Sequence, residues 1–143
     1  MLRLCDEVLR RMGETGCRDV RRMNALALAY VGDTIYDLFV RTLLVCSRAL
    51  PVYDLHVGAS ERVNAAAQAR AARALMDEFT AEELAVFRRG RNAKSRTVPR
   101  NANVGDYRAA TGLEAVLGFL YLTGREERAF ELLSKAMPPI EAE

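Results

Sequence analysis

Apolar side chains recur every three or four positions along most of this chain, which is the spacing of one face of an α-helix. The pattern predicts a short first helix over 2–12, a long second helix from about 24 to 46, and a last helix over 125–137. Between about 53 and 78 the chain is rich in alanine and arginine, and this composition fits one long helix or two shorter ones. Strand-like alternation is not needed anywhere, so the pattern predicts an all-α fold, a helical bundle in one domain.

Capping and turn signals divide the second half of the chain. Thr80 followed three residues later by Glu83 is a capping-box pattern, which predicts a helix from 81 to about 91. The segment 92–105 has no apolar periodicity and contains proline and glycine, so we expect a loop there.

Two of the most apolar segments each carry a single carboxylate. They are Ala25–Tyr36, which contains Asp33, and Gly112–Thr123, which contains Glu114 and belongs to a helix expected to begin between 106 and 111. A lone ionised acid in a buried helix costs on the order of several kcal/mol without a partner. We interpret the two acids as one site that converges on a divalent cation. Oxygen ligands without nearby cysteine or histidine favour Mg²⁺ or Mn²⁺ over zinc.

Glycines within these predicted helices support the convergence. Gly32, Gly112 and Gly118 each cost about 1 kcal/mol relative to alanine in a helix interior. That cost is explained if another backbone approaches closely, so we expect the two acidic helices to pack face to face. The alternative is a helical dimerisation module in which arginines inside the core neutralise the two acids.

Positive charge is concentrated in one stretch of the chain. The formal net charge is only +2, yet the stretch from position 88 to 100 contains basic residues and no acid. These basic residues are Arg88, Arg89, Arg91, Lys94, Arg96 and Arg100. A basic segment near a carboxylate–metal centre is typical of a phosphodiesterase that acts on nucleic acid. The alternative is a basic segment that is merely solvated.

The remaining composition narrows the class of protein. Three cysteines without CxxC spacing argue against a zinc site and against a disulfide framework. The first twelve residues carry five charges, which argues against a signal peptide, and no run of 18 apolar residues predicts a membrane span. We therefore expect a cytoplasmic protein without a membrane partner.

Two segments resemble the motifs of the ribonuclease III family. In AYVGDTIYDLFVR, an apolar run precedes a Gly-Asp pair and another follows it, as in the family signature. GLEAVLGFLYLTG is similar to the second motif, Glu-Ala followed by two hydrophobic residues and glycine. Across nearly the whole chain the sequence is similar to the short bacterial branch, Mini-ribonuclease III, which has no double-stranded-RNA-binding domain. The block RRGRNAKS…VPRNA…DYRAATGLEA is the most specific part of this resemblance.

The resemblance implies a homodimeric endonuclease domain over 1–143, with a basic loop at about 92–105, that cleaves double-stranded RNA. Its cofactor would be Mg²⁺, with Mn²⁺ as a substitute, and its products would carry 5′-phosphates. The implied task is maturation of the ends of the large-subunit (23S) ribosomal RNA precursor, with a large-subunit ribosomal protein as a candidate helper. Asp33 matches the catalytic aspartate, Glu114 the metal-binding glutamate, and Tyr30 an aromatic residue at the dimer contact.

Two positions depart from the pattern of full-length ribonuclease III. Ala29 and Thr111 stand where the longer relatives have a glutamate and an aspartate. The short branch shares this reduction, so we interpret the site as leaner and still catalytic, with the number of metal ions left open. The alternative is a non-catalytic RNA-binding or ribosome-assembly module that kept the fold and lost the activity.

Overall fold

The computed structural model describes residues 3–13, 19–47, 51–94, 98 and 100–137. In chain order its elements are α1 (Leu4–Arg11), the 3₁₀ helix η1 (Val20–Arg22), α2 (Ala25–Ser47), α3 (Val52–Val63), α4 (Ala65–Leu75), α5 (Ala81–Asn92), α6 (Val104–Leu122) and α7 (Glu126–Ala136). No strand occurs within these ranges, which confirms the all-α fold class. Within the same ranges, no helix is long and apolar enough to cross a membrane.

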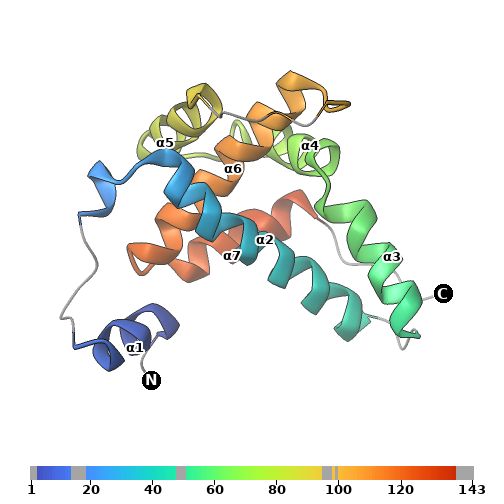
Figure 1. Ribbon diagram of the computed structural model, residues 1–143, viewed down its shortest axis with the longest axis horizontal. Coiled ribbons are helices and arrows are strands. Elements are labelled where there is room, and N and C mark those ends of the chain that lie inside the picture. The colour runs from blue at the N-terminus through green and yellow to red at the C-terminus, as the bar shows by residue number, and fades with distance from the viewer. Residues whose placement is uncertain (1–2, 14–18, 48–50, 95–97, 99, 138–143) are drawn as a thin grey trace.

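Helix α6 is the centre of the molecule. From Ala110 to Leu120 every residue except Glu114 is buried, so the helix is apolar on all sides and must be covered on all of them. Helices α2, α4, α5 and α7 all pack against it. Figure 1 shows α2 crossing α6 near its middle, with α4 and α5 above the crossing and α1 set apart at the lower left.

The α2–α6 crossing is a contact between two backbones. A Cβ atom at Gly32 would overlap the backbone carbonyl of Glu114, and a Cβ at Gly118 would overlap the carbonyl of Leu28. Only glycine permits this approach, which confirms the expectation that the two acidic helices pack face to face.

The third glycine, Gly112, contacts helix α5 instead of α2. A Cβ at Gly112 would lie 2.8 Å from the ring of Phe87 on α5, and one at Gly90 would lie 2.9 Å from the Cα of Gly112. This second glycine contact brings α5 close to α6 within one turn of Glu114. Helix α6 is therefore held tightly by both α2 and α5.

Helix boundaries follow the polar caps. The side chain of Asn64 accepts a hydrogen bond from the amide of Ala67 at 2.9 Å, so the alanine-rich region forms two helices, the second option left open by its composition. Helix α6 begins at Val104, earlier than predicted, because the side chain of Asn103 accepts from the amide of Asp106 at 3.0 Å. The 3₁₀ helix η1 was not expected from the pattern, and the predicted first residue of α1, Leu2, lies outside the described ranges.

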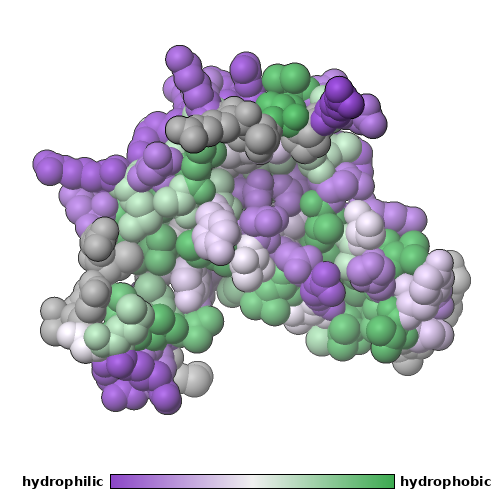
Figure 2. All heavy atoms as spheres, viewed as in Figure 1, coloured by the Kyte–Doolittle hydropathy of each residue, from purple (hydrophilic) through white to green (hydrophobic). Residues whose placement is uncertain are grey.

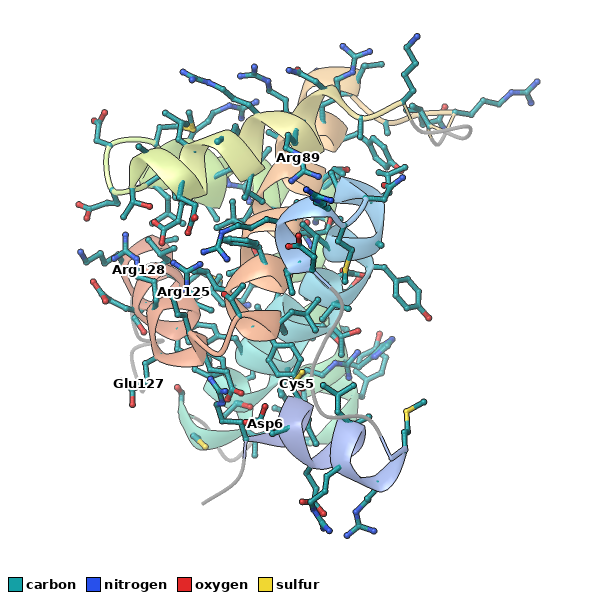
Figure 3. All side chains as sticks on the ribbon, turned by 90° about the vertical axis from the view of Figure 1, so that its left-hand side faces the viewer. Cys5, Asp6, Arg89, Arg125, Glu127 and Arg128 are labelled. Atoms are coloured by element: carbon teal, nitrogen blue, oxygen red, sulfur yellow. The ribbon has the colours of Figure 1, made fainter. Side chains whose placement is uncertain are left out.

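The predicted capping box at the start of α5 is confirmed and is part of a buried ion pair. The amide of Glu83 donates to the hydroxyl of Thr80 at 3.1 Å, and the amide of Thr80 donates to the Glu83 carboxylate at 3.0 Å. Glu83 is only 2% exposed, and Arg128 of α7 donates to both of its oxygens at 2.9 and 3.0 Å. Figure 3 shows Arg128 where α7 lies below α5. The pair therefore ties α7 to α5.

Replacing Arg128 by methionine is expected to lower the free energy of unfolding by about 3 kcal/mol at pH 7, because it leaves the buried Glu83 carboxylate without a positively charged partner. Urea denaturation measures the change. The control is Lys135→Met, which breaks an exposed pair with Glu78 (2.8 Å) and should cost less than about 1 kcal/mol. Equal losses in the two variants would contradict the special role of the buried pair.

Candidate active site

Asp33 and Glu114 meet where α2 crosses α6. Asp33 directly follows Gly32, which contacts the backbone of Glu114, and the two carboxyl groups share a hydrogen bond. Asp33 is exposed, and Glu114 is the one partly exposed residue in the buried stretch of α6. The fold thus brings together two acids that are far apart in the sequence and opens them to solvent at one point. Their catalytic role stays a prediction.

The charge state of the two carboxyl groups is compatible with the binding of a cation. Burial raises the pKa of Glu114 to about 9, and the charge of Asp33 and the hydrogen bond to it act in the same direction. At neutral pH the Glu114 carboxyl group therefore retains its proton, because burial and the adjacent carboxyl group both disfavour its ionised form. A divalent cation held by Asp33 and Glu114 would offset the charge of the ionised pair, so its binding would be linked to the loss of the Glu114 proton. A donor set of carboxylate oxygens alone fits Mg²⁺ or Mn²⁺.

Ala29 and Thr111, the two positions that differ from full-length ribonuclease III, supply no carboxylate that could bind a metal ion. Ala29 is a buried methyl group, and the hydroxyl of Thr111 donates to the backbone carbonyl of Tyr107 at 3.0 Å. In the part of the chain that the structure describes, no three side chains of His, Cys, Asp or Glu cluster in a way that could hold a metal ion. The protein therefore offers two carboxylates, which is sufficient for Mg²⁺ because this ion usually retains several waters.

The alternative with core arginines has no support in this geometry. The ion pairs among the described residues involve neither Asp33 nor Glu114. The arginine on the same helix, Arg41, pairs instead with Asp37 at 2.9 Å, one turn beyond Asp33. Among the described residues, the negative charge of the pair is thus lowered by the proton that Glu114 retains and not by a basic side chain.

Tyr36 is a neighbour of the pair that the sequence did not single out. It is buried, one turn after Asp33 on α2, and its hydroxyl donates to the backbone carbonyl of Arg62 at 2.8 Å. Burial raises the pKa of Tyr36 to about 12, so the phenol remains protonated. The bond holds α2 against the end of α3 beside the site. Its spacing from Asp33 was visible in the sequence but is equally typical of a core residue.

The six basic residues do not form one loop. Arg88, Arg89 and Arg91 belong to the last turns of α5, whereas Lys94 and Arg100 lie between α5 and α6. Arg96 lies outside the described residues. The first three lie on the helix predicted from 81 to about 91, which continues through Asn92, so only Lys94 and Arg100 among the described basic residues belong to the connection.

Two of these residues are engaged in the fold. Arg89 donates to the backbone carbonyls of Arg21 and Met23 at 3.2 and 2.6 Å, and Figure 3 shows it between α5 and the start of α2. Arg91 lies over the ring of Phe87, 6.0 Å from its centroid. The remaining described members are exposed and form no ion pair with any described acid, which leaves their charges available to a ligand. They are Arg88, Lys94 and Arg100.

An apolar surface lies beside the acidic pair. Tyr30 is 82% exposed, and with Leu4, Leu38 and Phe130 it lines a hollow of about 430 Å³ that also reaches Asp33. Figure 2 shows hydrophobic atoms gathered over α1 at the lower left, on the side that faces the rest of the molecule. Exposed apolar surface of this kind marks a site of protein association. The assignment of Tyr30 to a dimer contact stays a prediction.

Comparison with known proteins gives consistent results. The model of the Ribonuclease III domain matches residues 26–125. The chain is 44% identical to Mini-ribonuclease 3 of Enterococcus faecalis over 82% of this chain and 90% of that protein. It is 43% identical to Mini-ribonuclease 3 of Brevibacillus brevis over 88% of this chain and 94% of the relative. Among solved structures, protein FN1578 of Fusobacterium nucleatum matches with a TM-score of 0.74 and 29% identity, covering 82% of this chain and 94% of that one.

Proposed function

Because the chain belongs to the ribonuclease III family and is an endoribonuclease, we propose that it hydrolyses double-stranded RNA at the Asp33–Glu114 pair, with Mg²⁺ as cofactor and Mn²⁺ as a substitute. The observation that carries the proposal is the meeting of two carboxyl groups at the α2–α6 crossing, with no basic side chain of the described residues paired to either. Such a pair is costly for the fold unless a cation completes it.

The two acids have different positions in this proposal. Asp33 is exposed, so its carboxylate would hold the cation on the solvent side, where the phosphodiester would approach. Glu114 is less exposed than Asp33. The contact with Gly32 fixes its backbone and therefore limits where its carboxyl group can lie. When bound, the cation activates the attacking water and neutralises the charge that develops on the leaving 3′ oxygen.

The substrate follows from the charge of the exposed basic residues. An RNA duplex is recognised mainly through its shape, its 2′-hydroxyls and its phosphates. Arg88, Lys94 and Arg100 supply cations that contact phosphates without reading bases, so affinity should fall steeply with salt. We place the large-subunit (23S) ribosomal RNA precursor as the substrate and a large-subunit ribosomal protein as a candidate helper, on the strength of the resemblance.

The test of this function compares a duplex RNA with the same strand unpaired. In Mg²⁺ the purified protein should cut the duplex endonucleolytically, leave the single strand intact, and lose the activity in EDTA. Addition of Mn²⁺ should restore cutting. Binding to the duplex without cutting in either metal would instead support the non-catalytic RNA-binding module.

A homodimer is part of the proposal, with Tyr30 and the apolar hollow at the contact. A two-fold axis would place two sites across one duplex, so that each strand is cut once. Tyr30→Asp should raise the dimer dissociation constant at least about 10-fold, which corresponds to about 1.4 kcal/mol, in sedimentation velocity over a range of concentrations. The control is Tyr53→Asp on α3, which changes a tyrosine that is 76% exposed. A wild-type protein that sediments as a monomer, or an equal effect of both variants, would contradict the contact.

A further inference from the structure

Arg70 is a basic residue of the alanine-rich region and lies outside the basic stretch from position 88 to 100. It lies on α4, is exposed, and forms no ion pair with any acid in the part of the chain that the structure covers. The next arginine on the same helix, Arg73, behaves differently, because it donates to Asp106 of α6 at 2.7 Å. Arg70 therefore keeps a guanidinium whose donors are not used by an acid of the fold.

Helix α4 packs along α6, which carries Glu114, and the end of α3, just before α4, is bonded to α2. Near the start of α4, the hydroxyl of Tyr36 on α2 donates to the carbonyl of Arg62 at 2.8 Å. Near its end, Arg73 bonds Asp106, which precedes Glu114 by about two turns of α6. Arg70 lies between these two anchors, one turn before Arg73. The helix therefore holds it beside the region where α2 and α6 meet.

The electrostatics of Tyr36 agree with this placement. Burial is the main reason for the high pKa of the phenol; the positive charge of Arg70 acts to lower that pKa, and the charge of Glu114 acts to raise it. One buried hydroxyl is thus within electrostatic reach of both groups. Arg70 and Glu114 thus both act on a side chain one turn from Asp33, and no ion pair among the described residues joins Arg70 to either acid.

We propose that Arg70 binds a phosphate of the RNA strand that is cut, adjacent to the scissile one, and so positions that strand over Asp33 and Glu114. The inference rests on the proposed function. A guanidinium suits this role because it donates two parallel hydrogen bonds to a phosphate, which an ammonium group does not reproduce. A third element, α4, thereby joins α2 and α6 in forming the site.

The experiment compares Arg70→Gln and Arg70→Lys with the wild type and with Arg10→Gln. Arg10 is an exposed arginine of α1, which Figure 1 shows on the opposite side of the molecule from α4. For Arg70→Gln we expect KM for the duplex to rise about 10-fold, as for loss of one charge-assisted contact of about 1.4 kcal/mol. Binding measured in EDTA should show a slope of log K against log salt that is shallower by about 0.9. Arg70→Lys should have the salt slope of the wild type, and its KM should lie between the values of the wild type and Arg70→Gln.

The outcomes separate this inference from the function on which it rests. An Arg70→Gln variant with the KM and salt slope of the wild type, or of Arg10→Gln, overturns the phosphate contact while the nuclease stands. A wild type that never cuts the duplex overturns the nuclease, and the salt slope in EDTA still decides whether Arg70 contacts phosphate. Urea denaturation should give the same free energy of unfolding for all four proteins within about 0.5 kcal/mol, since Arg70 is a surface residue.

Discussion

Asp33→Asn should reduce the rate of duplex cleavage by at least about 10³-fold while the protein remains folded. The substitution removes a carboxylate that holds the cation, and a loss of about 4 kcal/mol of transition-state stabilisation corresponds to this factor. Single-turnover cleavage in Mg²⁺ measures the effect. The control is Asp37→Asn, one turn further along α2, where the carboxylate pairs with Arg41 and not with Glu114. Residual activity within about 10-fold of the wild type would contradict the assignment.

A second prediction concerns the stability of the metal-free protein and its dependence on pH. Burial, followed by the charge and hydrogen bond of Asp33, raises the pKa of Glu114 from 4.5 to about 9. Folding therefore favours the protonated acid, and its stabilising effect is full below pH 4.5 and is lost as the pH rises towards 9. Glu114→Gln should increase the free energy of unfolding by about 2 kcal/mol at pH 7.5 in EDTA and flatten the pH dependence over this range.

Urea denaturation at pH 5, 7.5 and 9 distinguishes the enzyme from its structural alternative. In a dimerisation module with acids paired inside the core, loss of Glu114 would destabilise the fold strongly. A stability loss of more than about 1 kcal/mol at pH 7.5 would therefore count against the nuclease site. A gain that disappears in saturating Mg²⁺ would support it, because the cation stabilises only the protein that keeps both carboxylates.

Gly118→Ala is expected to destabilise the protein by at least about 3 kcal/mol, or to prevent folding. The added methyl group would overlap the carbonyl of Leu28, and a backbone carbonyl inside a packed helix pair has no room to move. The variant should also lose cleavage, because any separation of α2 from α6 separates Asp33 from Glu114. Urea denaturation and the cleavage assay measure the two effects.

The matched control is Gly58→Ala on α3. There the nearest atom to an added Cβ is a methyl group of Leu44 at 3.3 Å, the mobile end of a side chain. We expect a change within about 1 kcal/mol, since the helix gains propensity while the leucine shifts slightly. A similar response of the two glycines would show that the α2–α6 contact is looser than the structure indicates.

Much of the local structure was predictable because its causes are local. The capping box of Thr80 and Glu83 marked the start of α5, and apolar periodicity marked α2, α6 and α7. Composition alone allowed either one helix or two between 53 and 78. The break between α3 and α4 depends on the cap at Asn64. Helix α6 begins before the predicted range of 106–111 because the side chain of Asn103 caps it.

The basic residues show that proximity in the sequence does not determine what each side chain contacts. Position along the chain grouped six cations, yet Arg89 bonds two backbone carbonyls that precede α2, whereas Arg88 faces solvent. Neighbours in sequence thus differ in role because they lie on different faces of one helix. Arg70 lies in the alanine-rich segment, outside the basic stretch, and its position relative to the acidic pair is set by the packing of α4 on α6.

The sequence by itself determined the helices, the family, and the identity of the two acids, because apolar period, caps and motif residues are properties of neighbouring positions. Only the tertiary structure decided that Asp33 and Glu114 share a hydrogen bond, that Glu114 is the open position in a buried helix, and which arginines remain without an acid partner. These depend on the backbone contact at Gly32 and Gly118, which joins segments about eighty residues apart. Periodicity indicates which face of a helix is buried, but the partner that covers it is settled by packing.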